Sequence, residues 1–134
     1  MTVKKSFLIL VAAISLVAVS FTACNSSNSA IETMSAENFE SKLQQTTAPQ
    51  LIDVRTPDEF NEFHIAGALN IDVNGAGFEE AITALNRAKP LFVYCRGGVR
   101  SMKAAEIMER EGFKTIYNLA GGITEWIEKG RPTE

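Results

Sequence analysis

Short apolar runs alternate with amphipathic segments along most of this chain. The runs are three to five residues long and lie between turn-forming residues, which favours strands buried in a parallel sheet; they are 51–54, 69–71, 91–94 and 115–119. The segments between them repeat apolar residues every three or four positions, which predicts helices over 36–45, 57–63, 78–88, 101–111 and 122–129. This alternation predicts an α/β fold with a parallel central sheet and helices on both of its faces.

The start of the second predicted helix is the best defined of these boundaries. Thr56 is a suitable N-cap, Pro57 suits the first helical position, and Glu59 completes a capping box. Phe60 and Phe63 are expected to point from this short helix into the core.

The N-terminus differs from the rest of the chain. Residues 1–5 carry two lysines, residues 7–21 form an apolar run broken only by two serines, and Thr22-Ala23-Cys24 follows. A charged start, an apolar stretch and a small-residue cleavage site are the layout of a secretory signal, and the run is short for a transmembrane helix. Phe21-Thr22-Ala23-Cys24 resembles a bacterial lipobox, in which the cysteine is lipidated.

These features predict an exported lipoprotein of the cell envelope, in the periplasm, held to a membrane by lipid on Cys24. The alternative is a secreted protein in which Cys24 is only a small residue of a signal that is cut elsewhere. The predicted parts are a signal peptide over 1–23, a flexible tether rich in Asn and Ser over 24–34, and one folded domain over 35–134.

Charge and cysteine content narrow the chemistry. The net charge is −3 and no basic run occurs, so nucleic acid is not an expected partner. Cys24 and Cys95 are the only cysteines, which excludes a disulfide framework. With Cys24 acylated, Cys95 would be the single free thiol of an exported protein. Such a thiol indicates a chemical use, with an inert buried cysteine as the alternative.

Cys95 occupies a position that favours a nucleophile. The strand 91–94 delivers it to Arg96-Gly97-Gly98-Val99-Arg100, after which Ser101 opens an amphipathic helix. Backbone N–H groups and the helix dipole at such a turn stabilise an anionic sulfur. Gly97 and Gly98 are expected to supply the positive φ angles that a tight cradle requires. In a parallel sheet, ligands bind beyond the carboxyl ends of the strands, where Cys95 falls and where Asp53 and Arg55 would lie on the same side.

Three ordered segments together resemble the single-domain rhodanese family. The first is Leu51-Ile52-Asp53-Val54-Arg55 with Glu59-Phe60 and His64-Ile65-Ala66-Gly67-Ala68, and the second is Cys95 to Ser101. The third is Gly121-Gly122 followed by Trp126, Gly130 and Pro132. The resemblance covers about 35–132. Phe63 and Ala66 depart from it, because the family often has Gly and Pro there.

The resemblance implies a sulfurtransferase in which Cys95 carries a persulfide. Donor binding would fall to the loop residues Arg96, Gly97, Gly98, Val99, Arg100 and Ser101. The two arginines and the loop N–H groups would also stabilise Cys95 as a thiolate. The expected partners are a small anionic sulfur donor, such as thiosulfate, and a thiol acceptor, with no metal and no cofactor. The protein is expected to be a monomer or a homodimer.

Four further residues are expected to support the site rather than to react: Asp53, Arg55, Glu59 and His64. Arg55 is expected to pair with Glu59 and fix the helix start, and the other glutamates to form a solvated face. His64 is expected to be structural, because it belongs to the scaffold part of the resemblance.

Two other functions stay open at this point. A cysteine-dependent phosphatase or arsenate reductase has five residues between its cysteine and arginine, whereas four separate Cys95 from Arg100. The shorter loop suits a persulfide sulfur better than a tetrahedral phosphoryl group. The second alternative is a rhodanese-like module that binds a persulfide or senses redox state without turnover.

Overall fold

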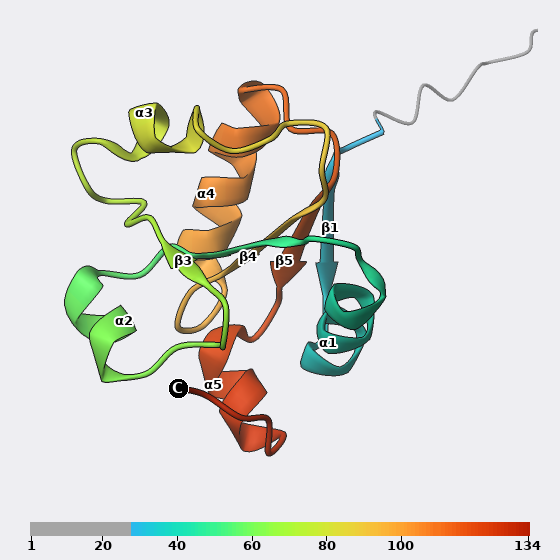
Figure 1. Ribbon diagram of the computed structural model, residues 1–134, viewed down its shortest axis with the longest axis vertical. Helices are drawn as coiled ribbons and strands as arrows, with labels where there is room; N and C mark the ends of the chain where they lie inside the picture. The colour runs from blue at the N-terminus through green and yellow to red at the C-terminus, as the bar shows by residue number, and fades with distance from the viewer. Residues whose placement is uncertain (1–27) are drawn as a thin grey trace, which may run out of the picture.

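The computed structural model describes residues 28–134. Its centre is a five-stranded sheet of order β1-β5-β4-β2-β3 in which every pairing is parallel. The strands are β1 (Ile31–Met34), β2 (Gln50–Asp53), β3 (Leu69–Asn70), β4 (Leu91–Tyr94) and β5 (Ile116–Leu119). Figure 1 shows β3 and β1 at opposite edges of the sheet. All four residues of β4 are buried, as expected for a strand with neighbours on both sides.

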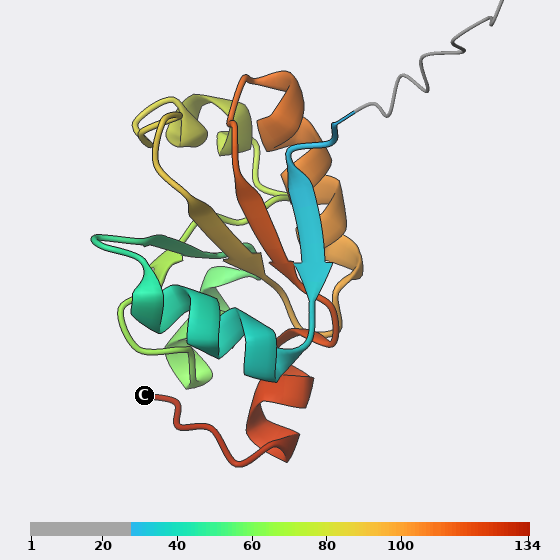
Figure 2. The same ribbon diagram turned by 90° about the vertical axis from the view of Figure 1, so that its right-hand side faces the viewer.

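Helices cover both faces of this sheet. They are α1 (Ala36–Gln45), α2 (Pro57–Glu62), α3 (Phe78–Ile82), α4 (Val99–Arg110) and α5 (Gly122–Glu128). On one face, α3 and α4 bury Ile82 and Met108 against side chains of β2, β4 and β5. On the other face, α1 and α5 bury Phe39 and Trp126. Figure 2 shows α1 and α4 on opposite sides of the strands. The predicted fold class is therefore confirmed.

The predicted tether is wrong over its last four residues. Ile31–Met34 form β1 and pair in parallel with β5, with Ile31 opposite Ile116 and Met34 opposite Leu119. The strand belongs to the folded domain because its backbone completes the edge of the sheet and Met34 is buried. The predicted signal peptide and Cys24 lie outside the described residues.

The predicted helix over 78–88 ends earlier, at Ile82. From Thr83 to Leu85 the backbone N–H groups bond three residues back, to Glu80, Ala81 and Ile82. The Thr83 hydroxyl also donates to the Glu80 carbonyl at 2.6 Å and so competes with the helical pattern.

Of the two expectations for α2, the capping box is correct and the burial of Phe60 and Phe63 in the core is not. The capping box at Thr56 and Glu59 is present, but no residue of this helix is buried. Phe60 stacks on the His64 ring at the surface, with centroids 3.8 Å apart, and Phe63 is only partly buried.

No helix within 28–134 has the length and apolar content needed to cross a bilayer.

Candidate active site

Cys95 follows the carboxyl end of β4 directly, and α4 starts four residues later. The turn between them depends on Gly98, which has φ = 103°. A side chain at Gly98 would collide with the Ala120 carbonyl oxygen behind the loop. Gly97 has no positive φ and open space where a Cβ would lie, so the expectation that both glycines supply positive φ angles is correct only for Gly98.

The sulfur of Cys95 lies inside this turn. The Gly98 N–H donates to Sγ at 3.1 Å, and the thiol donates to the Ser101 Oγ at 3.4 Å. The Ser101 hydroxyl in turn donates to the Gly98 carbonyl at 3.0 Å. Cys95 is only 1% exposed, whereas Arg96, Gly97 and Val99 around it are exposed. The sulfur is therefore buried beneath a loop in which these three residues face the solvent.

These contacts favour the thiolate. Burial, the largest single influence, raises the pKa of Cys95. In the thiolate form the Ser101 hydroxyl donates to Sγ instead of accepting from it, and this bond and the hydrogen bonds from the N–H groups of Ser101, Gly98 and Gly97 outweigh burial and hold the pKa below its ordinary value. The strongest groups that lower it are thus a hydroxyl and backbone N–H groups, not the arginine side chains.

The start of α5 holds the loop from behind. The N–H of Ile123 donates to the Cys95 carbonyl at 2.8 Å, and the N–H of Thr124 donates to the Arg96 carbonyl at 3.2 Å. Gly122 has φ = 61°, and a Cβ there would collide with the Arg96 carbonyl. Gly122 belongs to the third segment of the resemblance, but the sequence alone does not indicate that it contacts the cysteine loop.

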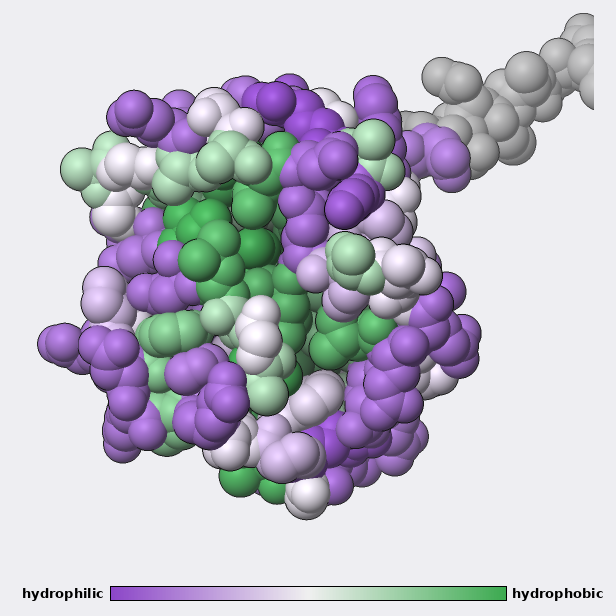
Figure 3. Space-filling view, viewed as in Figure 1, coloured by the Kyte–Doolittle hydropathy of each residue, from purple (hydrophilic) through white to green (hydrophobic). Residues whose placement is uncertain are grey.

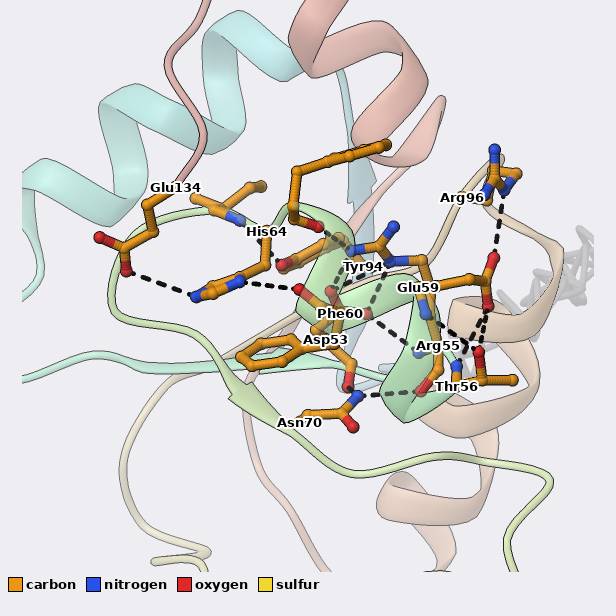
Figure 4. A network of polar contacts seen from close by, with 12 residues as sticks. Asp53, Arg55, Thr56, Glu59, Phe60, His64, Asn70, Tyr94, Arg96 and Glu134 are labelled. Carbon is orange, nitrogen blue, oxygen red and sulfur yellow. Dashed lines mark hydrogen bonds and ion pairs between the residues drawn. The ribbon is translucent and has the colours of Figure 1, made fainter.

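Glu59 reaches the same loop from α2. Its carboxylate accepts two hydrogen bonds from Arg100, at 2.7 and 2.9 Å, and one from Arg96 Nε at 3.1 Å. It also accepts from the Thr56 N–H at 3.1 Å. Figure 4 shows Glu59 between Thr56 and Arg96. The hydrogen bonds from Arg100 are the largest cause of a pKa of Glu59 far below its usual range, although burial opposes them.

The expected Arg55–Glu59 pair is wrong, because Arg55 pairs with Asp53. Both side chains are fully buried, with Nη2 2.7 Å from Asp53 Oδ2 and 2.7 Å from the Phe63 carbonyl. Burial lowers the pKa of Arg55, but its hydrogen bonds and charge interaction with Asp53 outweigh this and raise it. Arg55 Nη1 has no hydrogen-bond partner among the described residues. Asp53 ends β2 only two residues before Arg55 and contacts its guanidinium group, whereas Glu59 pairs with Arg96 and Arg100 of the cysteine loop.

His64 makes contacts that hold the chain rather than the sulfur. Its Nδ1 lies 2.9 Å from the Phe60 carbonyl and its Nε2 lies 3.4 Å from a Glu134 carboxylate oxygen. The backbones of His64 and Glu134 also exchange two hydrogen bonds, at 2.8 and 2.9 Å. Figure 4 shows the ring between Phe60 and Glu134. These contacts fit the structural role expected for His64.

The part of the chain that the structure describes has a groove away from the cysteine loop and no metal cluster. Within 28–134, no group of three or more His, Cys, Asp or Glu side chains is placed to hold a metal ion. A groove of about 330 Å³ lies against α3 and α4, lined by Val73, Phe78, Lys103 and Ile107 among others. Figure 3 shows apolar surface gathered over α4 and beside α3. The groove's lining includes no residue of the cysteine loop.

Comparison with known proteins gives one consistent family. The family model described as Rhodanese-like domain matches residues 35–129. The chain is 36% identical over 96 residues to YqhL, an uncharacterized protein of Bacillus subtilis, covering 72% of each chain. It is 37% identical over 76 residues to the thiosulfate sulfurtransferase GlpE of Coxiella burnetii, covering 57% of this chain and 69% of GlpE.

A solved structure agrees with these sequence matches. The rhodanese-related protein of Thermoplasma volcanium aligns with a TM-score of 0.67 at 30% identity, covering 77% of this chain and 97% of that one. The matched family range starts at Ser35, so β1 lies just outside it.

Proposed function

Because the chain belongs to the rhodanese-like domain family, we propose that it is a sulfurtransferase that moves a sulfane sulfur from an anionic donor such as thiosulfate to a thiol through a persulfide on Cys95. Sulfurtransferase activity is supported at the level of the family, in which related chains are named thiosulfate sulfurtransferases. The observation that carries the proposal is the cradle around the sulfur, where Gly98 N–H and Ser101 Oγ lie within 3.4 Å of Sγ.

The reaction divides into two displacements at sulfur. The Cys95 thiolate attacks the outer sulfur of thiosulfate, a new S–S bond forms, and sulfite leaves with the electron pair of the broken S–S bond. The acceptor thiolate then attacks the outer sulfur of the Cys95 persulfide. That step forms the acceptor persulfide and returns Cys95 as a thiolate, with no net redox change.

The loop supplies what both steps need. A thiolate is the reactive form of cysteine, and the lowered pKa of Cys95 raises its share at neutral pH. Hydrogen bonds from backbone N–H groups can follow the negative charge as it moves from Cys95 Sγ to the outer persulfide sulfur. Because Cys95 is almost fully buried while the loop is exposed, the donor would approach Sγ from the exposed side of the loop.

The direct test is to incubate the purified chain with thiosulfate and measure its intact mass. A gain of one sulfur atom in the wild type that is absent in Cys95→Ser supports the proposal. No gain, together with hydrolysis of an aryl phosphate, would overturn it in favour of a phosphatase. A stable gain of sulfur that no added thiol removes would instead support a binding module without turnover.

We further propose that the chain is exported and held to a membrane by lipid on Cys24. The support is the sequence pattern of residues 1–24. Cells that express the chain would be fed an alkyne-labelled fatty acid. Label on the wild type and on Cys95→Ser, and its loss with release from the membrane fraction in Cys24→Ser, is the expected result. Equal labelling of Cys24→Ser would contradict it.

A further inference from the structure

The two cationic side chains of the cysteine loop are both paired with Glu59. Arg100 contacts both carboxylate oxygens through its two terminal nitrogens, and Arg96 contacts one of them through Nε. The Glu59 side chain is 19% exposed, so solvent screens these pairs only in part. The guanidinium groups therefore do not form an open cationic pocket beside Cys95.

The position of Glu59 is fixed from outside the loop. It is the third residue of α2, and its carboxylate closes the capping box on the Thr56 N–H. It is separated from Arg96 by 37 residues and from Arg100 by 41. The pairing is thus a tertiary contact between two elements, held in place by the start of a helix.

The charges around the sulfur cancel as a result. Arg96 and Arg100 contribute two positive charges, and Glu59 and the Cys95 thiolate contribute two negative ones. A dianionic donor then meets no net positive charge, and the hydrogen-bond donors fixed beside Sγ are backbone N–H groups and the Ser101 hydroxyl. Attraction of the donor grows with its charge only if the site has net positive charge.

We propose that Glu59 is a specificity-determining residue that limits the negative charge of the sulfur donor. This inference rests on the sulfurtransferase function proposed above. The favoured donors are those in which the outer sulfur is attached to a body that leaves as a monoanion, such as a thiosulfonate or a persulfide. Thiosulfate reacts by the same displacement, but its dianionic charge places it at a disadvantage.

A matched pair of donors isolates this effect. Thiosulfate and methanethiosulfonate transfer the same sulfane sulfur, and a methyl group in the second replaces one charged oxygen of the first. Attack by the Cys95 thiolate releases sulfite from thiosulfate and methanesulfinate from methanethiosulfonate. In both cases one S–S bond breaks, one forms, and Cys95 becomes a persulfide.

The experiment measures the rate of persulfide formation at Cys95 in the full chain with each donor. In Glu59→Gln the ratio of the thiosulfate rate to the methanethiosulfonate rate should rise about two- to sixfold, the effect of one unit charge at roughly 8 Å in a partly screened site. Gln keeps an oxygen that can accept from the Thr56 N–H. An unchanged or lower ratio would overturn the proposal.

Two further variants serve as controls of charge and of folding. Glu62→Gln removes the same charge from an exposed position of α2, and its ratio should equal that of the wild type. Arg96 is half exposed, so Arg96→Gln should fold normally and shift the ratio in the opposite direction. A double variant of Glu59→Gln and Arg96→Gln restores the charge and should return the ratio to near the wild-type value.

A second reagent pair decides the role of Glu59 without sulfur transfer. Iodoacetate and iodoacetamide alkylate the same thiolate and differ by one negative charge. The ratio of the iodoacetate rate to the iodoacetamide rate at Cys95 should rise in Glu59→Gln by a similar factor. A ratio equal to that of the wild type would contradict the proposal. If no donor loads Cys95 while this ratio still shifts, the sulfurtransferase function fails and the control of charge by Glu59 stands.

Discussion

At the scale of single residues, Ser101 is one of the groups that lower the pKa of Cys95. Burial alone would raise the pKa of the thiol, and the hydroxyl of Ser101 is the first of the hydrogen-bond donors that reverse this. Ser101 is itself fully buried, so its hydroxyl is not replaced by bulk water when it is removed.

Ser101→Ala should therefore raise the pKa of Cys95. The rate of alkylation by iodoacetamide follows the thiolate fraction, so its midpoint should move to higher pH in the variant. Val99 lies in the same loop and is 84% exposed, so Val99→Ala should leave the midpoint unchanged. A midpoint in Ser101→Ala equal to that of the wild type would show that the backbone N–H groups alone set the pKa.

The two glycines of the loop provide a second prediction at this scale. Gly98→Ala should lower the free energy of unfolding by about 2–4 kcal/mol, because it combines a left-handed φ with a collision against Ala120. Gly97→Ala should change it by less than about 0.5 kcal/mol, since its Cβ meets open space. Urea denaturation measures both, and equal effects would contradict the assignment of strain to Gly98.

At the scale of elements, the start of α2 links helix capping to the active site. Glu59 belongs at once to the capping box and to the ion pairs with Arg96 and Arg100. Loss of these pairs should cost about 1–3 kcal/mol of stability at neutral pH. Glu59→Gln should therefore unfold at a lower urea concentration than Glu62→Gln.

The ion pairs of Glu59 also predict that the free energy of unfolding depends on pH in the acid range. The pKa of Glu59 is lower in the folded protein than in the unfolded chain, so its contribution is fully present above about pH 4.3 and is lost as pH falls toward the folded-state pKa. The difference in unfolding free energy between the wild type and Glu59→Gln should thus shrink from pH 6 to pH 3. A difference that stays constant over this range would contradict it.

The sequence predicts elements well where the signal is local. The helix 36–45 and the capping box at Thr56 are correct because N-caps and apolar spacing act within one or two turns. The prediction that Arg55 pairs with Glu59 is wrong. It rested on their closeness in the sequence, whereas the actual partners of Glu59, Arg96 and Arg100, lie 37 and 41 residues away and reach it only through the tertiary fold. The predicted tether includes Ile31–Met34 because this edge strand has polar residues and only one buried side chain, so its sequence lacks the apolar pattern of a core strand.

At the scale of the whole molecule, the site is built from three segments that meet beyond the carboxyl ends of the strands. The loop after β4 holds the sulfur, the start of α2 pairs with its arginines, and the start of α5 bonds to its carbonyls. These are the three segments that resemble the rhodanese family in the sequence. Their order could be read from the sequence, but the contacts between them depend on the tertiary fold.

β1 gives the last prediction, because the sheet depends on it beyond the range that the family model matches. Removing residues 1–34 would make β5 a new sheet edge and would remove the buried Met34 side chain from the core. The Ala120 N–H would also lose its hydrogen bond to the Met34 carbonyl. A chain that begins at Ser35 should thus be about 2–4 kcal/mol less stable than one that begins at Asn28, given the lost ladder bonds. It should also aggregate more readily, because β5 then offers unpaired backbone groups to other chains. Urea denaturation and light scattering of the two chains measure this, and equal stability would mean that β1 is only a docked tether.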